Sequence, residues 1–303
     1  MSKTVLVVGE SLLDIVRGPD GSTTELPGGS AANVAVALAR LGRKVRFATS
    51  WGDDDRGRIL AAWLARDGVA LAADPLAVDH TSTALATLGP DGQATYEFDV
   101  GWRLNPIVEG PDPVVVHTGS LGAVLQPGAA EVVRLLERLR GAATISYDVN
   151  ARPGITGTGP ELVARVEAVA TLSDVVKVSD EDLAALYDDL DPLAGAKRLL
   201  ALGPAAVVIT RGPDGATWLT PNQEVDVAAV PVVVADTIAA GDTFCAALLD
   251  ALWRRELLGA DRRDLLRDAP RDVIVDVMAQ AARAAAVTVG RPGADPPYRS
   301  ELL

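Results

Sequence analysis

Residues that bind metals or form disulfides are scarce in this sequence. Its 303 residues include one cysteine, Cys245, and two histidines, His80 and His117. One cysteine excludes an internal disulfide framework and a cysteine-based zinc site, and two histidines exclude a histidine-rich metal centre. Apolar residues nevertheless make up 49% of the chain, which is enough for a full globular core.

Positive charge is also scarce. Lys and Arg number 28 against 41 Asp and Glu, so the formal net charge is −13. Only four residues are lysine: Lys3, Lys44, Lys177 and Lys197. An acidic chain repels the phosphates of nucleic acids and anionic lipids, so neither nucleic acid nor a membrane is expected as a partner. An anionic substrate would need a local binding site that does not rely on lysine.

Long hydrophobic runs are absent. No stretch approaches the length of a membrane span, and the apolar run at residues 4–8 is too short for a signal peptide. We therefore expect a cytoplasmic protein.

Strand-like and helix-like segments alternate along most of the chain. This alternation predicts an α/β fold with a mainly parallel central sheet that helices flank on both faces. Strands are expected at 4–9, 45–52, 114–119, 143–150, 175–179, 205–212, 216–220 and 224–234. Helices are expected at 30–41, 54–67, 129–140, 161–172, 180–187, 192–202, 243–255 and 273–288.

Two hairpin signals interrupt this pattern. The turns Gly18-Pro19-Asp20-Gly21 and Gly89-Pro90-Asp91-Gly92 each separate two short alternating runs. They predict a small, separate β-sheet.

The strongest local motif is DTIAAGDTF at residues 236–244, which precedes an apolar helix. Small residues at Ala239, Ala240 and Gly241 let backbone N–H groups approach a ligand, and the positive end of the helix dipole points to the same place. Such a site can hold a phosphoryl group without lysine, and Asp242 can accept a proton from an attacking hydroxyl. The alternative is that Asp242 only caps the helix.

A second motif, LPGGSAAN at residues 26–33, places a glycine pair before a helix. Asn33 lies on the first turn, where it can contact a polyol; the alternative is a tight turn with a cap. The sequence has no GxxxxGK[ST] loop, and no GxGxxG follows the first strand, so P-loop NTPases and Rossmann dehydrogenases lose their main support.

Together the two motifs resemble the signatures of the PfkB (ribokinase-like) carbohydrate kinases, and the resemblance covers essentially the whole chain. PGGSAANVAVALARLG resembles the N-terminal signature of that family, and DTIAAGDTFCAALL resembles the C-terminal one. Three further stretches are similar to family segments: YDVNARP at 147–153, TRGPDG at 210–215 and TVGRPGADPP at 288–297.

The resemblance implies a ribokinase-like kinase domain over residues 1–303, with a β-sheet lid formed by residues 12–28 and 79–104. It implies ATP-dependent phosphorylation of a sugar hydroxyl, with Asp242 as the base and the N–H groups of Ala239, Ala240 and Gly241 as the anion hole. Because the lid often mediates dimerisation in this family, the resemblance also implies a homodimer. The implied sugar-binding residues are Asp14, Gly28, Gly29, Asn33, Arg103, Ser120 and Arg152.

The implied cofactors are ATP, Mg²⁺ and a monovalent cation such as K⁺. ATP would contact Asn150, Lys177, Ser179, Thr210, Gly212, Gly215 and Gly241. Asp182 would belong to the Mg²⁺ environment, and the cation would lie near Asp236, Ile238, Thr288, Arg291 and Gly293.

Three departures from the family pattern stand out. The NxxE motif of the family reads Ser179-Asp180-Glu181-Asp182 here, which puts the positioning of Mg²⁺ in doubt. The anion-hole loop reads AAGD where many members have GAGD. Ser30 replaces the lysine usual in ribokinases, which argues against ribose.

Other conspicuous residues have simpler interpretations. His117 and Cys245 are expected to pack in the core, and Asp53-Asp54-Asp55 to begin a solvated helix. Trp102 is the one tryptophan expected to do more than pack, because it lies in the lid region.

We therefore predict a fructokinase-like sugar kinase. A 2-keto-3-deoxygluconate kinase, with Arg103 and Arg152 holding the acid, and a ribokinase remain alternatives. A nucleoside kinase is disfavoured because the lid lacks an obvious aromatic platform for a base. A non-catalytic sugar- or nucleotide-binding regulator is the alternative from a different class.

Overall fold

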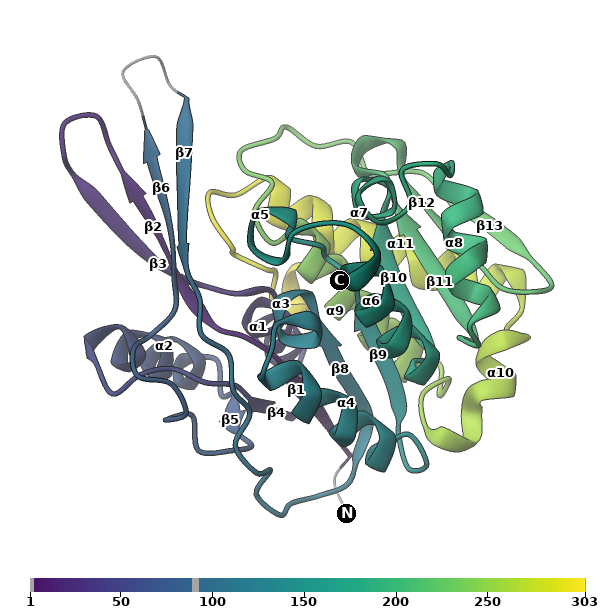
Figure 1. The fold of residues 1–303 in the computed structure, drawn as a ribbon. Coiled ribbons are helices and arrows are strands. Elements are labelled where there is room, and N and C mark those ends of the chain that lie inside the picture. Colours follow the sequence, from purple (N-terminus) through teal and green to yellow (C-terminus); the bar gives the residue numbers. More distant parts are fainter. Residues whose placement is uncertain (1–2, 89–92, 303) are drawn as a thin grey trace.

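The computed structural model describes residues 3–88 and 93–302. Within this part of the chain, the main sheet has nine strands in the order β13-β12-β11-β10-β9-β8-β1-β4-β5 (Figure 1). Its strands are β1 (Thr4–Val8), β4 (Val45–Ala48), β5 (Ala70–Leu71), β8 (Pro113–Gly119), β9 (Thr144–Asp148), β10 (Val175–Ser179), β11 (Ala206–Thr210), β12 (Ala216–Leu219) and β13 (Glu224–Val227).

The predicted parallel α/β architecture is confirmed. Strands β5 to β11 pair in parallel through β4, β1, β8, β9 and β10, whereas β12 and β13 are antiparallel at one edge. The central strand β1 is buried along its whole length. Such a strand needs apolar side chains on both faces, which explains the TVLVV run.

Helices cover both faces of this sheet. One face carries α1 (Ser30–Arg40), α2 (Asp55–Arg66), α9 (Ala240–Arg254), α10 (Arg263–Arg267) and α11 (Arg271–Val289). The other carries α3 (Ser120–Val124), α4 (Gly128–Leu139), α6 (Pro160–Leu172), α7 (Asp180–Leu186) and α8 (Pro192–Ala201). Shorter elements are α5 (Pro153–Thr156), η1 (Gly212–Asp214), η2 (Ala260–Arg262) and η3 (Arg299–Glu301).

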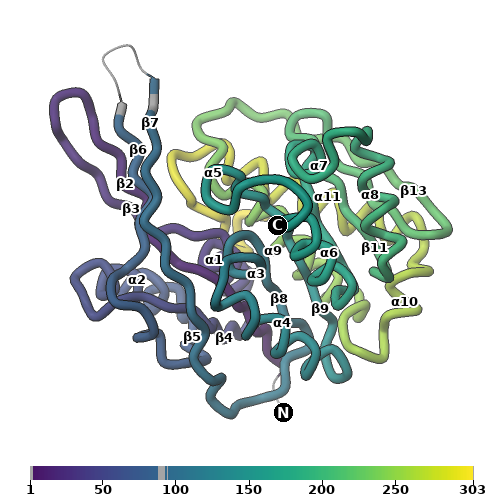
Figure 2. The backbone as a smooth tube through the Cα atoms, viewed as in Figure 1, coloured from purple at the N-terminus to yellow at the C-terminus, as the bar shows by residue number. Residues whose placement is uncertain are grey.

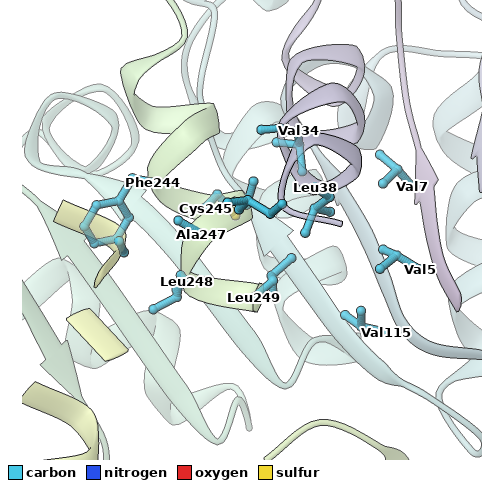
Figure 3. Packing of buried hydrophobic residues seen from close by; sticks show 14 of the residues in the cluster. Val5, Val7, Val34, Leu38, Val115, Phe244, Cys245, Ala247, Leu248 and Leu249 are labelled. Carbon is cyan, nitrogen blue, oxygen red and sulfur yellow. The ribbon is translucent and has the colours of Figure 1, made fainter. Parts of the chain in front are cut away.

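Helices α1 and α9 lie side by side against β1. Figure 3 shows Val34 and Leu38 of α1 between Val5 and Val7 of β1 and the buried side chains of α9. Small alanines on both helices allow this close approach. The N-termini of the two helices are thereby fixed next to each other.

The predicted separate sheet is also present. Its four strands, in the order β3-β2-β6-β7, form a narrow sheet that stands away from the main body (Figures 1 and 2). The strands are β2 (Leu12–Arg17), β3 (Thr23–Gly28), β6 (Thr83–Leu88) and β7 (Ala94–Asp99). The predicted turn Gly89-Pro90-Asp91-Gly92 lies outside the described residues. We call this four-stranded sheet the lid.

Two expectations about individual segments are wrong. Strand β13 ends at Val227, and residues 228–234 are irregular, because Pro231 has no N–H to donate to a neighbouring strand. Trp102 does not belong to the lid: it is 1% exposed in the core, and its Nε1 donates to Gly122 O at 2.9 Å. In the described part of the chain, no helix is long and apolar enough to span a membrane.

Candidate active site

The order of the strands places a topological switch point beside β1. From β1 the chain first builds β4 and β5 on one side, and later β8 to β11 on the other. In open α/β sheets, ligands bind at such a switch point, beyond the carboxyl ends of the strands. The residues of both sequence motifs lie at this edge.

A glycine fixes the start of α1. Gly29 is the N-cap, with φ of 100°, which favours a residue without a Cβ. A Cβ at this position would also lie 2.9 Å from Glu10 O and Ser11 Cα. The glycine pair therefore allows the first turn of α1 to approach the end of β1.

Helix α9 begins at an unusual alanine. Its N-cap, Ala239, is left-handed, with φ of 58° and ψ of 13°, and Ala240 and Gly241 begin the helix. Ala240 N–H makes a long bond of 3.3 Å to Thr237 O. The N–H groups of Ala239, Gly241 and Asp242 have no hydrogen-bond partner among the described residues. Three free donors at the positive end of a helix form a site for an anion.

Asp242 lies directly beside these donors and is only 7% exposed. Ser30 Oγ donates to its Oδ1 at 2.7 Å, and Asn33 Nδ2 donates to its Oδ2 at 2.8 Å. Burial raises the pKa of Asp242, although the bonds from Ser30 and Asn33 and the charges of Lys177 and Arg152 oppose the shift. The carboxylate is thus oriented and poised to accept a proton.

Sequence analysis missed Glu10. This side chain follows β1 and is 3% exposed. Its Oε1 accepts Ser30 N–H at 3.2 Å, and its Oε2 accepts Gly122 N–H at 2.7 Å. Burial raises the pKa of Glu10 to about 7, although hydrogen bonds from the backbone N–H groups of Glu10 itself and of Gly122 oppose the shift. Glu10 therefore joins β1, α1 and α3, and only its position after a buried strand could have indicated this role.

Glu10→Gln should reduce the fall in the free energy of unfolding between pH 5 and pH 8, because glutamine does not titrate, whereas burial raises the pKa of Glu10 to about 7 and so makes its ionised form destabilising. Urea denaturation measures the change. Glu25→Gln in the lid is the control: Glu25 pairs with exposed Arg56, and its loss should cost below about 1 kcal/mol. The same pH dependence of stability in Glu10→Gln and wild type would contradict a raised pKa at Glu10.

Most of the predicted sugar-binding residues lie around Asp242. Asp14 comes from β2 of the lid, and a Cβ at Gly28 would lie 2.2 Å from its Oδ2, so only glycine leaves room. Asp14 has no hydrogen-bond partner among the described residues. Burial raises its pKa to about 6, with Arg152 lowering it and Asp242 raising it further.

The other predicted sugar-binding side chains differ in their hydrogen bonds and exposure. The buried Oδ1 of Asn33 has no hydrogen-bond partner. Arg152 is exposed and acts electrostatically on Glu10, Asp14 and Asp242. Ser120 is buried, and its Oγ donates to Asn150 O at 3.1 Å. Arg103 differs from the others: it is exposed and makes no hydrogen bond or ion pair within the described residues.

The lid does carry an aromatic pair, contrary to expectation. Tyr96 and Phe98 stack with ring centroids 6.2 Å apart and an interplanar angle of 6°. Phe98 is opposite Ala84, which in turn is beside Asp14, so Phe98 and Asp14 share a face of the lid. Phe98 Cε2 would lie 3.5 Å from a Cβ at Gly154 on α5. The pair was missed because its two aromatics are separated along the sequence by Glu97.

The predicted nucleotide-binding residues lie along one edge of the sheet. Ser179 and Thr210 end the neighbouring strands β10 and β11, and Asn150 follows β9 with a φ of 37°. Gly212 and Gly215 have φ of 48° and 87° in the turn after β11. These residues follow adjacent strands, as an elongated ligand lying across the strand ends would require.

Lys177 forms a buried ion pair below the anion site. Its Nζ lies 3.1 Å from each carboxylate oxygen of Asp148, and the two side chains are 6% and 0% exposed. Burial opposes the charged form of Lys177, but Asp148 and Asp182 raise its pKa. A Cβ at Gly241 would lie 3.0 Å from Nζ, so the ammonium lies next to the first turn of α9. Sequence analysis named Lys177 but not Asp148.

Asp182 is held by backbone groups. Its Oδ1 accepts Ala151 N–H at 2.7 Å and its Oδ2 accepts Ser179 N–H at 2.8 Å, while Ser179 Oγ accepts Asp182 N–H at 3.0 Å. This capping box explains why serine and aspartate can occupy an NxxE position. No group of three or more metal-ligating side chains exists in the described part of the chain.

The predicted cation residues lie on two adjoining segments, because Asp236 N–H donates to the carbonyl of Val289, the residue after Thr288, at 3.2 Å. The Asp236 carboxylate accepts hydrogen bonds from Ile238 N–H at 3.0 Å and from Gly293 N–H at 2.9 Å, so these three residues lie together. Thr288 instead donates to Thr243 Oγ1 at 3.0 Å, and Arg291 pairs with Glu301 and Asp295.

The chain is similar to known carbohydrate kinases. Residues 2–300 match the profile of the pfkB family carbohydrate kinases. A fructokinase of Rhizobium leguminosarum bv. trifolii is 36% identical over 270 residues, which cover 84% of this chain and 81% of that protein.

Solved structures of kinases share the fold of this chain over nearly its whole length. The fructokinase of Xylella fastidiosa with bound ATP matches with a TM-score of 0.87 and 28% identity, over 100% of this chain and 97% of that one. The aminoimidazole riboside kinase of Salmonella enterica, complexed with aminoimidazole riboside and an ATP analogue, matches with a TM-score of 0.79, 27% identity and coverages of 99% and 98%.

A fructokinase double mutant of Vibrio cholerae O395, in its fructose, ADP and potassium ion bound form, matches with a TM-score of 0.76 and 26% identity over 99% of this chain and 97% of that one. The family profile and the fold match over nearly the whole sequence. The chain belongs to the pfkB family of carbohydrate kinases.

Proposed function

We propose that this kinase phosphorylates fructose with ATP, and that Asp242 is the catalytic base. The observation that carries the proposal is the arrangement of Asp242 between free N–H donors on α9 and free sugar-facing groups on the other side. Those groups are the carboxylate of Asp14 and the buried Oδ1 of Asn33, which suit sugar hydroxyls. The fructokinases among the relatives support the choice of sugar.

In the reaction, a sugar hydroxyl oxygen forms a bond to the γ-phosphorus as the bond from that phosphorus to the ADP oxygen breaks. Asp242 takes the hydroxyl proton. Ser30 and Asn33 hold its two oxygens, so that the carboxylate is oriented before the substrate arrives. The N–H groups of Ala239 and Gly241 stabilise charge on the transferring group, and Lys177 adds positive charge beneath them.

We infer that ATP lies across Asn150, Ser179, Thr210, Gly212 and Gly215. Mg²⁺ binds proteins through one or two carboxylates, together with substrate phosphates and waters, so a site without a carboxylate cage suits it. Asp182 would contact it through water, since both its oxygens accept N–H bonds. Mg²⁺ would neutralise the phosphate charge.

A potassium ion near Asp236, Ile238 and Gly293 is the proposed monovalent cation site, with Thr288 and Arg291 adjoining it. The Vibrio cholerae fructokinase with bound potassium supports it. We further propose a cytoplasmic homodimer that forms through the lid. Apolar lid side chains support the dimer: Val16, Leu26, Tyr96 and Phe98 are 39%, 47%, 64% and 41% exposed.

Activity and stability should respond to pH in opposite directions. Asp242 must be ionised to accept a proton, and its pKa is raised; Asp14 and Glu10 have pKa values of about 6 and about 7. We therefore expect kcat/KM to rise with pH above the ordinary aspartate value of about 4, and to keep rising through about 6, where the sugar-facing Asp14 ionises.

The same raised pKa values mean that the folded state binds protons that the unfolded state has released. The free energy of unfolding should therefore fall as pH rises from about 4.5 to 7. Initial rates and urea denaturation over this pH range test both trends. A kcat/KM plateau already reached at pH 5 would contradict the first.

A riboside kinase is the second candidate. The Tyr96–Phe98 pair on the Asp14 side of the lid offers a face on which a flat heterocycle can stack. The aminoimidazole riboside kinase among the similar structures supports this reading.

The test is ATP consumption by the purified protein across fructose, ribose, 2-keto-3-deoxygluconate, tagatose 6-phosphate, nucleosides and aminoimidazole riboside, with and without K⁺. We expect the highest kcat/KM for fructose. A higher kcat/KM for a riboside would show that fructose is not the preferred substrate. Binding of ligands with no turnover of any acceptor would indicate a regulator.

A further inference from the structure

A cavity of about 230 Å³ lies at the far ends of α1 and α9 from the proposed active site. It opens between α9, α11 and the C-terminal segment. Its lining residues are Leu41, Ala247, Asp250, Arg254, Gln280, Arg283, Arg299 and Leu302. An adjoining hollow shares Leu41, Arg254 and Arg299 and adds Arg43. We call the two together the arginine pocket.

Two of its arginines are held in place by one buried carboxylate. Arg43 Nε and Arg299 Nη2 each lie 2.6 Å from Asp250 Oδ1, and the Asp250 side chain is only 6% exposed. Arg299 Nε also donates to Leu41 O at 2.8 Å, and Arg43 stacks over the ring of Trp253. These bonds fix two guanidinium groups before any ligand binds, which lowers the entropic cost of binding.

The other two arginines are not neutralised. Arg254 makes a hydrogen bond of 3.4 Å to the neutral amide of Gln280. The Arg283 side chain has no hydrogen bond or ion pair with any described residue, and both Arg254 and Arg283 are exposed. Among the described residues, four arginines and one carboxylate thus line the arginine pocket, in a chain whose net charge is −13.

Helix dipoles do not account for this excess charge. Arg254 ends α9, where a cation is favourable, but Arg283 lies six residues before the end of α11. An acidic protein gains nothing in solubility from concentrating arginines in one hollow. A bound anion would explain the arrangement.

We propose that the arginine pocket binds a phosphoryl dianion, either inorganic phosphate or a small phosphate ester. A guanidinium group can donate two parallel N–H bonds to two oxygens of one phosphate. The cavity is also smaller than pockets that hold drug-sized ligands, so a small anion suits it. Arg254 and Arg283 supply the charge that the ligand neutralises. This site is independent of the proposed fructose phosphorylation.

The pocket is separate from the site for ATP. Arg254 lies twelve residues after Asp242 on the same helix, which corresponds to about 18 Å along the helix axis. A ligand there does not compete with ATP phosphates at the first turn of α9. Binding should therefore persist when the active site is filled.

The test measures the melting temperature as inorganic phosphate is added at constant ionic strength. Mg²⁺ and a non-hydrolysable ATP analogue saturate the active site throughout. A parallel series uses glycerol phosphate, and comparing the two series separates free phosphate from an ester. A ligand that binds only the folded state raises the melting temperature in a saturable way.

We expect wild type to show such a rise with at least one of the two probes. Arg254→Ala/Arg283→Ala should weaken the apparent affinity by about tenfold or more. The control, Arg58→Ala/Arg134→Ala, makes the same change in net charge at two exposed arginines on α2 and α4 and should behave as wild type.

The proposal is overturned if neither probe stabilises wild type. It is also overturned if the control loses as much affinity as the pocket variant, because the effect would then reflect overall charge. Equal affinity of the pocket variant and wild type would contradict it as well.

Discussion

Asp242→Asn should lower kcat by about 10³-fold, because general-base catalysis contributes about 10²–10⁴. Asparagine has nearly the same shape as aspartate, but its amide cannot take the proton of the sugar hydroxyl. Its Oδ1 can still accept from Ser30 Oγ, and Asn33 can rotate its amide to bond the new N–H₂. The fold and the affinity for ATP should therefore be retained.

Steady-state kinetics, together with the dissociation constant of ATP, separate these effects. Asp55→Asn is the control, since Asp55 also lies in the first turn of a helix, α2, and its side chain is 92% exposed. It should leave kcat unchanged. If Asp242→Asn kept more than about one tenth of the wild-type kcat, general-base catalysis by this residue would be wrong.

Lys177→Met should have the largest effect on stability. Methionine removes the ammonium and leaves Asp148 as a buried carboxylate that is 0% exposed and has lost its counter-ion. Breaking a buried pair on one side costs about 3–5 kcal/mol of unfolding free energy. Activity should fall as well, because the same ammonium lies beside Gly241 at the anion site.

A second substitution separates the two roles of Lys177. In Lys177→Met/Asp148→Asn no unpaired charge remains, so urea denaturation should recover most of the lost stability, whereas kcat should stay low. Lys197→Met on the exposed side of α8 is the control and should change stability by less than about 0.5 kcal/mol. If the double variant recovered wild-type kcat, Lys177 would have no part in the reaction.

The sequence predicted the parts of this protein that depend on local pattern. The alternation of strands and helices predicts the main sheet, and the two turn motifs predict the lid. The glycine pair at Gly28 and Gly29 and the AAGD segment predict where the N-termini of α1 and α9 lie. Parallel strand ends bring such motifs to one edge of the sheet, so a correct fold also places the site.

Features that depend on tertiary contacts were missed. Glu10 is recognisable only when Ser30 and Gly122, which are distant in sequence, present their N–H groups to one carboxylate. Asp148 is defined by its neighbour Lys177 on the next strand. Trp102 was misplaced because the chain leaves the lid just before it and enters the core beside Gly128. None of these contacts has a periodic signature.

The departures from the family pattern also became clear only in three dimensions. Ser179 and Asp182 form a capping box that reaches Ala151 after β9. Ala239 adopts the left-handed conformation that glycine would adopt more easily, at a cost of about 1–2 kcal/mol. Neither change disrupts the arrangement of groups around Asp242.

Transfer of phosphate labelled in the γ-position of ATP tests the central claim most directly. The purified wild-type protein is incubated with labelled ATP, Mg²⁺, K⁺ and fructose, and the products are separated. We predict that the label appears in a fructose phosphate, in amounts equal to the ADP formed, and that omission of fructose abolishes ADP formation. Label released only as inorganic phosphate, or no ADP with any sugar, would contradict the account.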